Sequence, residues 1–123
     1  MPSRKSVEGL IALVEKSAFI EALETWYADD AVTHENQGEA RRGLPKLIEL
    51  ERGVMATFPN IRSRCVRPYF IDGDHAAIRW QFEFETAGGH IVKMEEIAHQ
   101  LWRGEKIVEE RFFYDPAQTR PPR

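Results

Sequence analysis

Two carboxylates placed among aromatic residues are the side chains of this sequence best suited to chemistry. Glu96 and Glu110 both lie in the C-terminal half, where most of the 7 Phe, 3 Trp and 3 Tyr residues also occur. An apolar environment disfavours the charged form of a carboxyl group, so such an acid holds its proton more tightly than it would in water. A protonated carboxyl group can stabilise an oxygen that gains negative charge, which predicts acid–base chemistry that needs no metal or cofactor.

The other reactive residue types lack a pattern that points to a site. The single cysteine, Cys65, has no evident histidine partner and is interpreted as an inert, half-buried thiol. Gly88 and Gly89 follow one strand pattern and precede another, which is typical of a hairpin turn and not of a phosphate-binding loop. The histidines lack metal-ligand spacing, so no metal site is expected at His34, His75, His90 or His99.

The composition favours one folded domain and argues against several partners. With 123 residues, 42% hydrophobic and 30% charged, the chain can bury one core but is too short for two. The net charge of -3 gives no general attraction to phosphate groups, so no nucleic acid partner is expected. No apolar run approaches the length of a membrane span or a signal segment, and one cysteine cannot form an internal disulfide. These features predict a cytoplasmic protein with no membrane partner.

Three helices are expected in the first half of the chain. Apolar residues recur at i, i+3, i+4 and i+7 within 7–14 and again within 19–26, with Ser17 as the expected cap of the second helix. A third helix begins near Pro45, which suits a first helical turn, and is stopped by Pro59. Its apolar residues are expected to be buried: Leu47, Ile48, Val54, Met55 and Phe58.

Four strands are expected in the second half. Residues 78–85 alternate apolar and polar side chains, as a half-buried strand does, and turns rich in glycine separate this strand from its neighbours. The other strands are expected at about 61–71, 90–102 and 106–115. Helices followed by a run of strands predict an α+β architecture, in which helices cover one face of a mainly antiparallel sheet.

The hairpin loops set which side chains share a face of this sheet. A three-residue loop in the first hairpin pairs Trp80 with Glu96, Phe82 with Met94, and Glu83 with Lys93. The same loop length in the second hairpin pairs Ala98 with Glu110, Glu96 with Phe112, and Met94 with Tyr114. One aromatic face with embedded acids is then expected, formed by Trp80, Phe82, Phe84, Met94, Glu96, Ala98, Gln100, Trp102, Glu110, Phe112 and Tyr114.

The opposite face of the sheet is too apolar for simple exposure and too charged for a core. It combines four apolar residues with five charged or titratable ones: Ile97, Leu101, Ile107 and Phe113, and Arg79, Glu95, His99, Glu109 and Arg111. Such a mixture suits a contact between two copies of the chain. A homodimer through the outer sheet face is therefore predicted.

Three segments of the chain have a recognisable pattern: residues 26–35 (WYADDAVTHE), Arg42-Gly43 before a helix, and residues 104–115 (GEKIVEERFFYD). Together they resemble the SnoaL-like branch of the nuclear transport factor 2-like (ketosteroid isomerase-like) superfamily. The resemblance covers nearly the whole chain. It implies an α+β cone, in which a curved, mainly antiparallel sheet wraps around a deep pocket with three N-terminal helices, commonly as a dimer. We expect one such domain over residues 1–117, followed by a loose tail over 118–123.

The resemblance also suggests roles for single residues. Glu35 occupies the position of the general-base carboxylate of the ketosteroid isomerases, whereas their two oxyanion donors correspond to Ile11 and Ala98, which cannot donate in the same way. Glu110, expected beside the small Ala98, is a substitute acid, and Glu96 is a second one. Tyr114 or Gln100 would assist them. The acid set of limonene epoxide hydrolase and the base of the polyketide cyclases are not reproduced.

These expectations lead to two function classes. In the first, the protein is a cofactor-independent isomerase, cyclase or dehydratase in which Glu35 removes a proton α to a carbonyl or activates a water. In the second, the same pocket binds a ligand or a partner without catalysis. In either class the bound molecule is expected to be small and hydrophobic or polyketide-like. Beside the acids, the expected pocket residues are His34, Tyr27, Trp80, Phe82, Met94, Gln100, Trp102, Phe112 and Tyr114, with either His34 or Glu35 facing inward.

Overall fold

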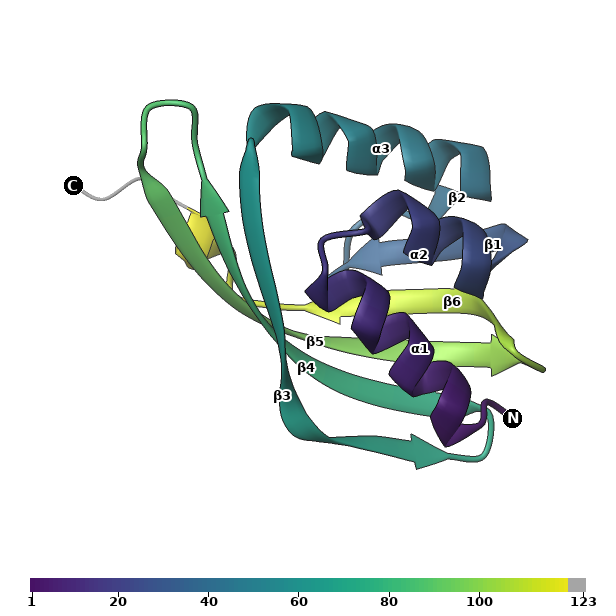
Figure 1. The fold of residues 1–123 in the computed structure, drawn as a ribbon. Coiled ribbons are helices and arrows are strands. Elements are labelled where there is room, and N and C mark those ends of the chain that lie inside the picture. Colours follow the sequence, from purple (N-terminus) through teal and green to yellow (C-terminus); the bar gives the residue numbers. More distant parts are fainter. Residues whose placement is uncertain (120–123) are drawn as a thin grey trace.

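A computed structural model describes residues 1–119, in which three α-helices cover the concave side of one curved sheet (Figure 1). The helices are α1 (Arg4–Glu15), α2 (Phe19–Trp26) and α3 (Leu44–Thr57). The strands are β1 (Tyr27–Glu35), β2 (Arg41–Arg42), β3 (Asn60–Asp72), β4 (His75–Glu85), β5 (Ile91–Arg103) and β6 (Lys106–Phe113). Their order in the sheet is β2-β1-β6-β5-β4-β3, and of these described strands β1 and β6 pair in parallel while all other neighbours are antiparallel. This arrangement confirms the predicted α+β cone. Among the described residues, no helix has the length and apolar character needed to cross a membrane.

The first two helices form where apolar spacing predicts them, although the expected cap of α2 is wrong. Ser3 caps α1, because its hydroxyl accepts a hydrogen bond from the Ser6 backbone N–H at 3.1 Å. Ser17 lies in the turn before α2 with a φ of +61°. Its hydroxyl donates to the Ile61 carbonyl at 2.6 Å, so it joins the helical turn to β3, and Ala18 occupies the cap position.

Helix α3 begins and ends close to its predicted limits, but much of its apolar face stays open. Leu47 is buried, whereas Val54 and Met55 are 36% and 37% exposed. Burial of these two side chains was predicted, and that prediction is wrong. For Val54 the reason is that α3 stands above a cavity, which Val54 and Phe58 line, whereas Met55 is not among the lining residues.

The first hairpin has the predicted register, with Trp80 opposite Glu96 and Phe82 opposite Met94. The predicted register of the second hairpin is wrong, because Ala98 pairs with Phe112 and Gln100 with Glu110. Two features cause this shift: a turn of only two residues between Arg103 and Lys106, and a bulge next to Leu101 and Trp102. The two changes together shift the pairing by an even number of residues, so Glu96, Gln100, Glu110 and Phe112 keep the predicted inner face. The bulge also turns Ile107, predicted on the outer face, into the core, where it is fully buried.

The core occupies one end of the cone, between α1, α2 and the sheet. Its fully buried members include Ile11, Ile78, Trp102 and Ile107.

At the C-terminal end of the described chain, a 3-10 helix over Pro116–Thr119 follows β6. The side chain of Gln118 accepts a hydrogen bond from the Glu95 N–H at 2.9 Å and donates to the Glu95 carbonyl at 3.0 Å. Gln118 is therefore attached to the sheet, whereas the Thr119 hydroxyl donates to the Pro116 carbonyl at 2.8 Å. Residues 120–123 of the predicted tail lie outside the described residues.

Candidate functional site

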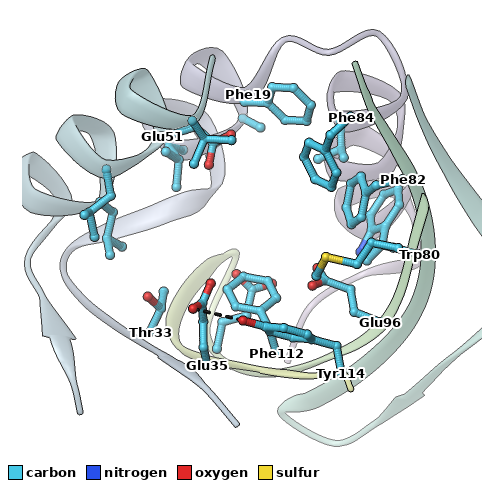
Figure 2. A pocket seen from close by; sticks show the side chains of 18 of the residues that line it. Phe19, Thr33, Glu35, Glu51, Trp80, Phe82, Phe84, Glu96, Phe112 and Tyr114 are labelled. Atoms are coloured by element: carbon cyan, nitrogen blue, oxygen red, sulfur yellow. Dashed lines mark hydrogen bonds between the residues drawn. The ribbon is translucent and has the colours of Figure 1, made fainter. Parts of the chain in front are cut away.

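A cavity of about 360 Å³ opens between α3 and the inner face of the sheet, with α2 closing one side. This volume is in the range of sites for one small molecule. Figure 2 shows aromatic rings along one wall and carboxyl groups from both the sheet and α3. The apolar lining consists of Leu10, Val14, Phe19, Ala22, Leu23, Leu47, Leu50, Val54, Phe58, Trp80, Phe82, Phe84, Val92, Met94 and Phe112. The polar or charged lining consists of Tyr27, Thr33, Glu35, Arg41, Glu51, Glu96, Gln100, Glu110, Tyr114 and Thr119.

The structure brings most of the predicted site residues together around this cavity. Glu35, Glu96 and Glu110 line it, as do Tyr27, Trp80, Phe82, Met94, Gln100, Phe112 and Tyr114. Two residues do not, and for them the expectation is corrected. Trp102 is fully buried in the core beneath the cavity. The alternation of β1 turns Thr33 and Glu35 inward and His34 outward, where its Nδ1 lies 3.1 Å from the Gly38 carbonyl oxygen.

Glu110 lies at the floor of the cavity, and the protein itself satisfies both of its carboxyl oxygens. The hydroxyl of Tyr27 donates to Oε1, and Nε2 of Gln100 donates to Oε2 at 2.7 Å. Gln100 is fixed in turn, because the indole N–H of Trp102 donates to its Oε1 at 3.0 Å. Burial raises the pKa of Glu110 to about 7, although the hydrogen bonds from Tyr27 and Gln100 oppose the shift. The neighbour of Glu110 across the strands is thus Gln100 and not the expected Ala98.

Glu96 has different surroundings from those of Glu110. The Glu96 residue is only 8% exposed. Its carboxyl group has no hydrogen-bond or ion-pair partner among the described residues. Burial raises its pKa to about 8, and the negative charges of Glu110, Glu35 and Glu51 add to the shift. Glu96 is therefore a cavity-facing acid that holds its proton at neutral pH.

Glu35 lies at the end of β1, at a more exposed edge of the cavity. The Tyr114 hydroxyl donates to its Oε2 at 3.1 Å, as Figure 2 shows. On its other side, Nη1 of Arg41 lies 3.4 Å from Oε1, and Nε of Arg41 donates to the Thr33 hydroxyl at 3.0 Å. Burial and the charge of Glu35 raise the pKa of Tyr114. Two neighbours thus hold the Glu35 carboxyl group in one orientation while it stays open to the cavity.

Sequence reasoning missed Glu51 and Arg41 as cavity residues. Glu51 projects from α3 across the cavity from Glu35 (Figure 2), and burial raises its pKa while the charge of Arg41 opposes the shift. A signal for it existed, because Leu47, Glu51 and Val54 have the spacing of one helical face. Arg41 had no such signal, since it belongs to a strand of two residues that exists only by pairing with β1.

A metal site needs three or more ligating side chains around one point. Within residues 1–119, no group of three or more His, Cys, Asp or Glu side chains is arranged to hold a metal ion. The four carboxyl groups of the cavity are distributed over its floor and walls and do not converge on one point.

A curved α+β cone with an acid-bearing internal cavity defines a class of small single-domain proteins. The sequence matches the SnoaL-like domain over residues 7–110, and the chain belongs to this SnoaL-like family. No curated protein matches the sequence.

Several solved structures share the fold at low sequence identity. A putative SnoaL-like polyketide cyclase from Jannaschia sp. CCS1 is 15% identical, with a TM-score of 0.78 over 95% of this chain and 93% of that one. A hypothetical protein with a ketosteroid isomerase-like fold from Catenulispora acidiphila DSM 44928, in complex with trimethylamine, is 18% identical (TM-score 0.79, 94% and 89% covered). TerC, co-crystallised with polyporic acid, is 14% identical (TM-score 0.77, 92% and 91% covered). At these identities the likeness concerns the fold, and it agrees with the predicted ketosteroid isomerase-like cone.

Proposed function

We propose that the cavity binds one small, mainly apolar organic molecule and that the protein acts on it by carboxylate acid–base chemistry. The volume of about 360 Å³ and the largely apolar walls support the binding half of this proposal. Two proteins of the same fold were crystallised with small molecules, polyporic acid in one and trimethylamine in the other, which supports small-molecule binding by this chain as well.

One observation carries the catalytic half: Glu96 is a buried carboxyl group that faces the cavity and has no hydrogen-bond or ion-pair partner within residues 1–119. With a pKa of about 8, it can donate a proton or a hydrogen bond to a bound molecule at neutral pH. Glu35 has a more exposed position, next to Tyr114 and Arg41. Two carboxyl groups in such unequal surroundings suit the separate roles of acid and base.

In this proposal Glu35 is the general base. It removes a proton from a carbon next to a carbonyl group, or from a water molecule, while Tyr114 and Arg41 keep its carboxyl group in place. Glu96 donates to the oxygen on which negative charge develops. Glu110 keeps the floor of the cavity in shape through Tyr27 and Gln100. The reaction classes that these steps support are isomerisation, cyclisation and loss of water.

A Glu35→Gln variant tests the proposal, with substrates taken from the small molecules that mass spectrometry finds on the purified protein. We expect turnover to be abolished and the thermal unfolding midpoint to change little, because the Glu35 side chain is 51% exposed. Glu49→Gln, on the exposed face of α3, is the matched control and keeps full turnover. Turnover by Glu35→Gln at the rate of this control would contradict the role of Glu35.

A second candidate function, binding without catalysis, is favoured by one specific observation. The resemblance to ketosteroid isomerases places Ile11 and Ala98 at the positions of their two oxyanion donors, and both residues are fully buried and apolar. A molecule that binds equally to the native protein and to Glu35→Gln, with no product from either, would support this function.

We further propose a homodimer through the outer face of the sheet. Ile97 and Phe113 pair across β5 and β6 on this face and are 47% and 41% exposed. Light scattering at micromolar concentration is expected to give twice the chain mass of 14.3 kDa, and Ile97→Glu to give one chain mass. A monomeric native protein would contradict the proposal. A cytoplasmic location stays a prediction from the sequence.

A further inference from the structure

The ionisable groups on the cavity wall are mostly acidic. Among the described residues that line it, four are carboxylic acids, whereas Arg41 is the only one with a cationic side chain. Arg41 is already engaged, with Glu35 at 3.4 Å and Thr33 at 3.0 Å. A bound molecule therefore meets three further acids that no cation of the wall contacts: Glu51, Glu96 and Glu110.

This imbalance favours one sign of charge on the bound molecule. Away from bulk water, charges interact more strongly because the local dielectric constant is low. A negative charge on the ligand would be repelled by the wall acids when they are ionised. A positive charge would be attracted, and it would supply the partner that Glu96 lacks.

The aromatic walls favour the same sign of charge. The faces of aromatic rings are negative, so they attract ammonium groups, most strongly where water is excluded. Trp80 and Phe82 stack with their ring centroids 5.9 Å apart, and the ring of Phe84 lies 5.6 Å from that of Phe82. Glu96 pairs directly with Trp80 across β4 and β5, which places a carboxyl group at the end of this row of rings (Figure 2).

We propose that the molecule bound in the cavity is a small hydrophobic amine, protonated or quaternary, whose nitrogen lies between the carboxyl group of Glu96 and the rings of Trp80 and Phe82. This inference rests on the binding half of the proposed function, because it names the ligand class of the same cavity. It replaces the proton-donor role of Glu96 with a role in pairing with the bound nitrogen. The apolar part of the amine lies toward Val54, Phe58 and Phe84, at the side of the cavity under α3.

Binding of such a cation is coupled to the ionisation of Glu96. When a quaternary ammonium ion enters, the Glu96 carboxyl group releases one proton to solvent and its carboxylate pairs with the nitrogen. The other charged groups that act on Glu96 are Glu110 on β6, Glu35 on β1, Glu51 on α3 and Arg41 on β2. Affinity is expected to rise up to tenfold per pH unit as the pH approaches the pKa of Glu96, about 8, and to level off above it.

The test compares two probes of nearly the same shape with the intact protein. Benzyltrimethylammonium carries the charge, and neopentylbenzene is its neutral analogue. Binding is measured by the fluorescence change of the tryptophans at pH 6.0, 7.0 and 8.5. We expect the cation to bind at least tenfold more tightly than the neutral probe at pH 8.5, and this preference to shrink toward pH 6.0.

A matched pair of variants assigns the effect to one residue. Glu96→Gln is expected to lose most of the preference for the cation and to keep its affinity for the neutral probe. Glu49→Gln, an exposed residue of α3, is expected to behave as the native protein does. Calorimetry of the native protein at pH 7.0, below the pKa of Glu96, in two buffers of different ionisation enthalpy provides a measurement that needs no variant. Cation binding should release protons, and binding of the neutral probe should release none.

The outcomes separate this inference from the proposed function. Equal affinity for both probes, a preference that survives in Glu96→Gln, or cation binding without proton release would each overturn the amine inference, while binding of the neutral probe would still support a small-molecule cavity. If neither probe binds, the amine inference is overturned and the binding half of the proposed function is contradicted as well.

Discussion

The two ends of the inner sheet face are built from the same strands, yet one is filled and the other is hollow. At the closed end, Ile78, Trp102 and Ile107 are fully buried beneath α1 and α2. At the open end, Phe82 and Phe84 of the same strand β4 are half-buried and line the cavity under α3. The difference lies in the helices above and not in the apolar character of the strands. An alternating aromatic strand therefore indicates an inner face without showing whether that face is core or cavity.

The acids of the two ends differ in the same way. Glu110, next to the closed end, receives hydrogen bonds from Tyr27 and Gln100, and its surroundings are complete without a ligand. Glu96, toward the open end, has no partner among the described residues. A buried acid without a partner destabilises the protein when it ionises. Such a group is best explained by function, which is why the two proposals rest on Glu96.

The largest expected loss in the free energy of unfolding separates two variants, each of which removes one aromatic residue from one end. Trp102→Ala should lower the free energy of unfolding by about 4 kcal/mol, because it leaves a cavity in a closed core. Phe84→Ala should lower it by only about 1 kcal/mol, because its ring already borders open space. Urea denaturation of both variants measures the difference. Equal losses would show that the open end is as tightly packed as the closed one.

The sequence was most informative where local rules decide the outcome. The alternation in β4 and the glycine turn after it determine the pairing of Trp80 with Glu96, and this register was predicted correctly. The second hairpin was predicted with the wrong pairs, because neither its two-residue turn nor its bulge has a distinct sequence signal. The inner face was still predicted correctly there except at Ile107, since the register error beyond the bulge was an even number of residues.

Features that depend on distant parts of the chain could not be predicted. The bulge that turns Ile107 into the core is one, and the hydrogen bond that draws Ser17 away from its capping role toward Ile61 is another. Arg41 reaches the site only because β2 pairs with β1. Glu51 is different, because its position on the Leu47 face of α3 is visible in the sequence. It was overlooked because that face was expected to pack against a closed core.

The next prediction concerns the pH dependence of stability. It compares the variants Glu96→Gln and Glu110→Gln. Glu96 has a folded-state pKa of about 8 and an ordinary value of 4.5, so the folded protein keeps a proton that the unfolded chain loses between these pH values. The free energy of unfolding therefore falls as the pH rises through this window. Glu96→Gln removes this loss. It should match the native protein at pH 4 and be more stable by on the order of 4 kcal/mol at pH 8.5.

Glu110→Gln is the matched comparison and should give the smallest effect. The pKa of Glu110 rises only to about 7, so less stability is lost on ionisation. Its ionised form also accepts hydrogen bonds from both Tyr27 and Gln100, and an amide cannot accept both in the same geometry. We expect a gain of about 1 kcal/mol at pH 8.5, from partial cancellation of these two effects. Urea denaturation from pH 4 to 9 measures both variants. An equal gain from the two would show that hydrogen bonding does not distinguish Glu110 from Glu96, and would remove the main reason to place the ligand at Glu96.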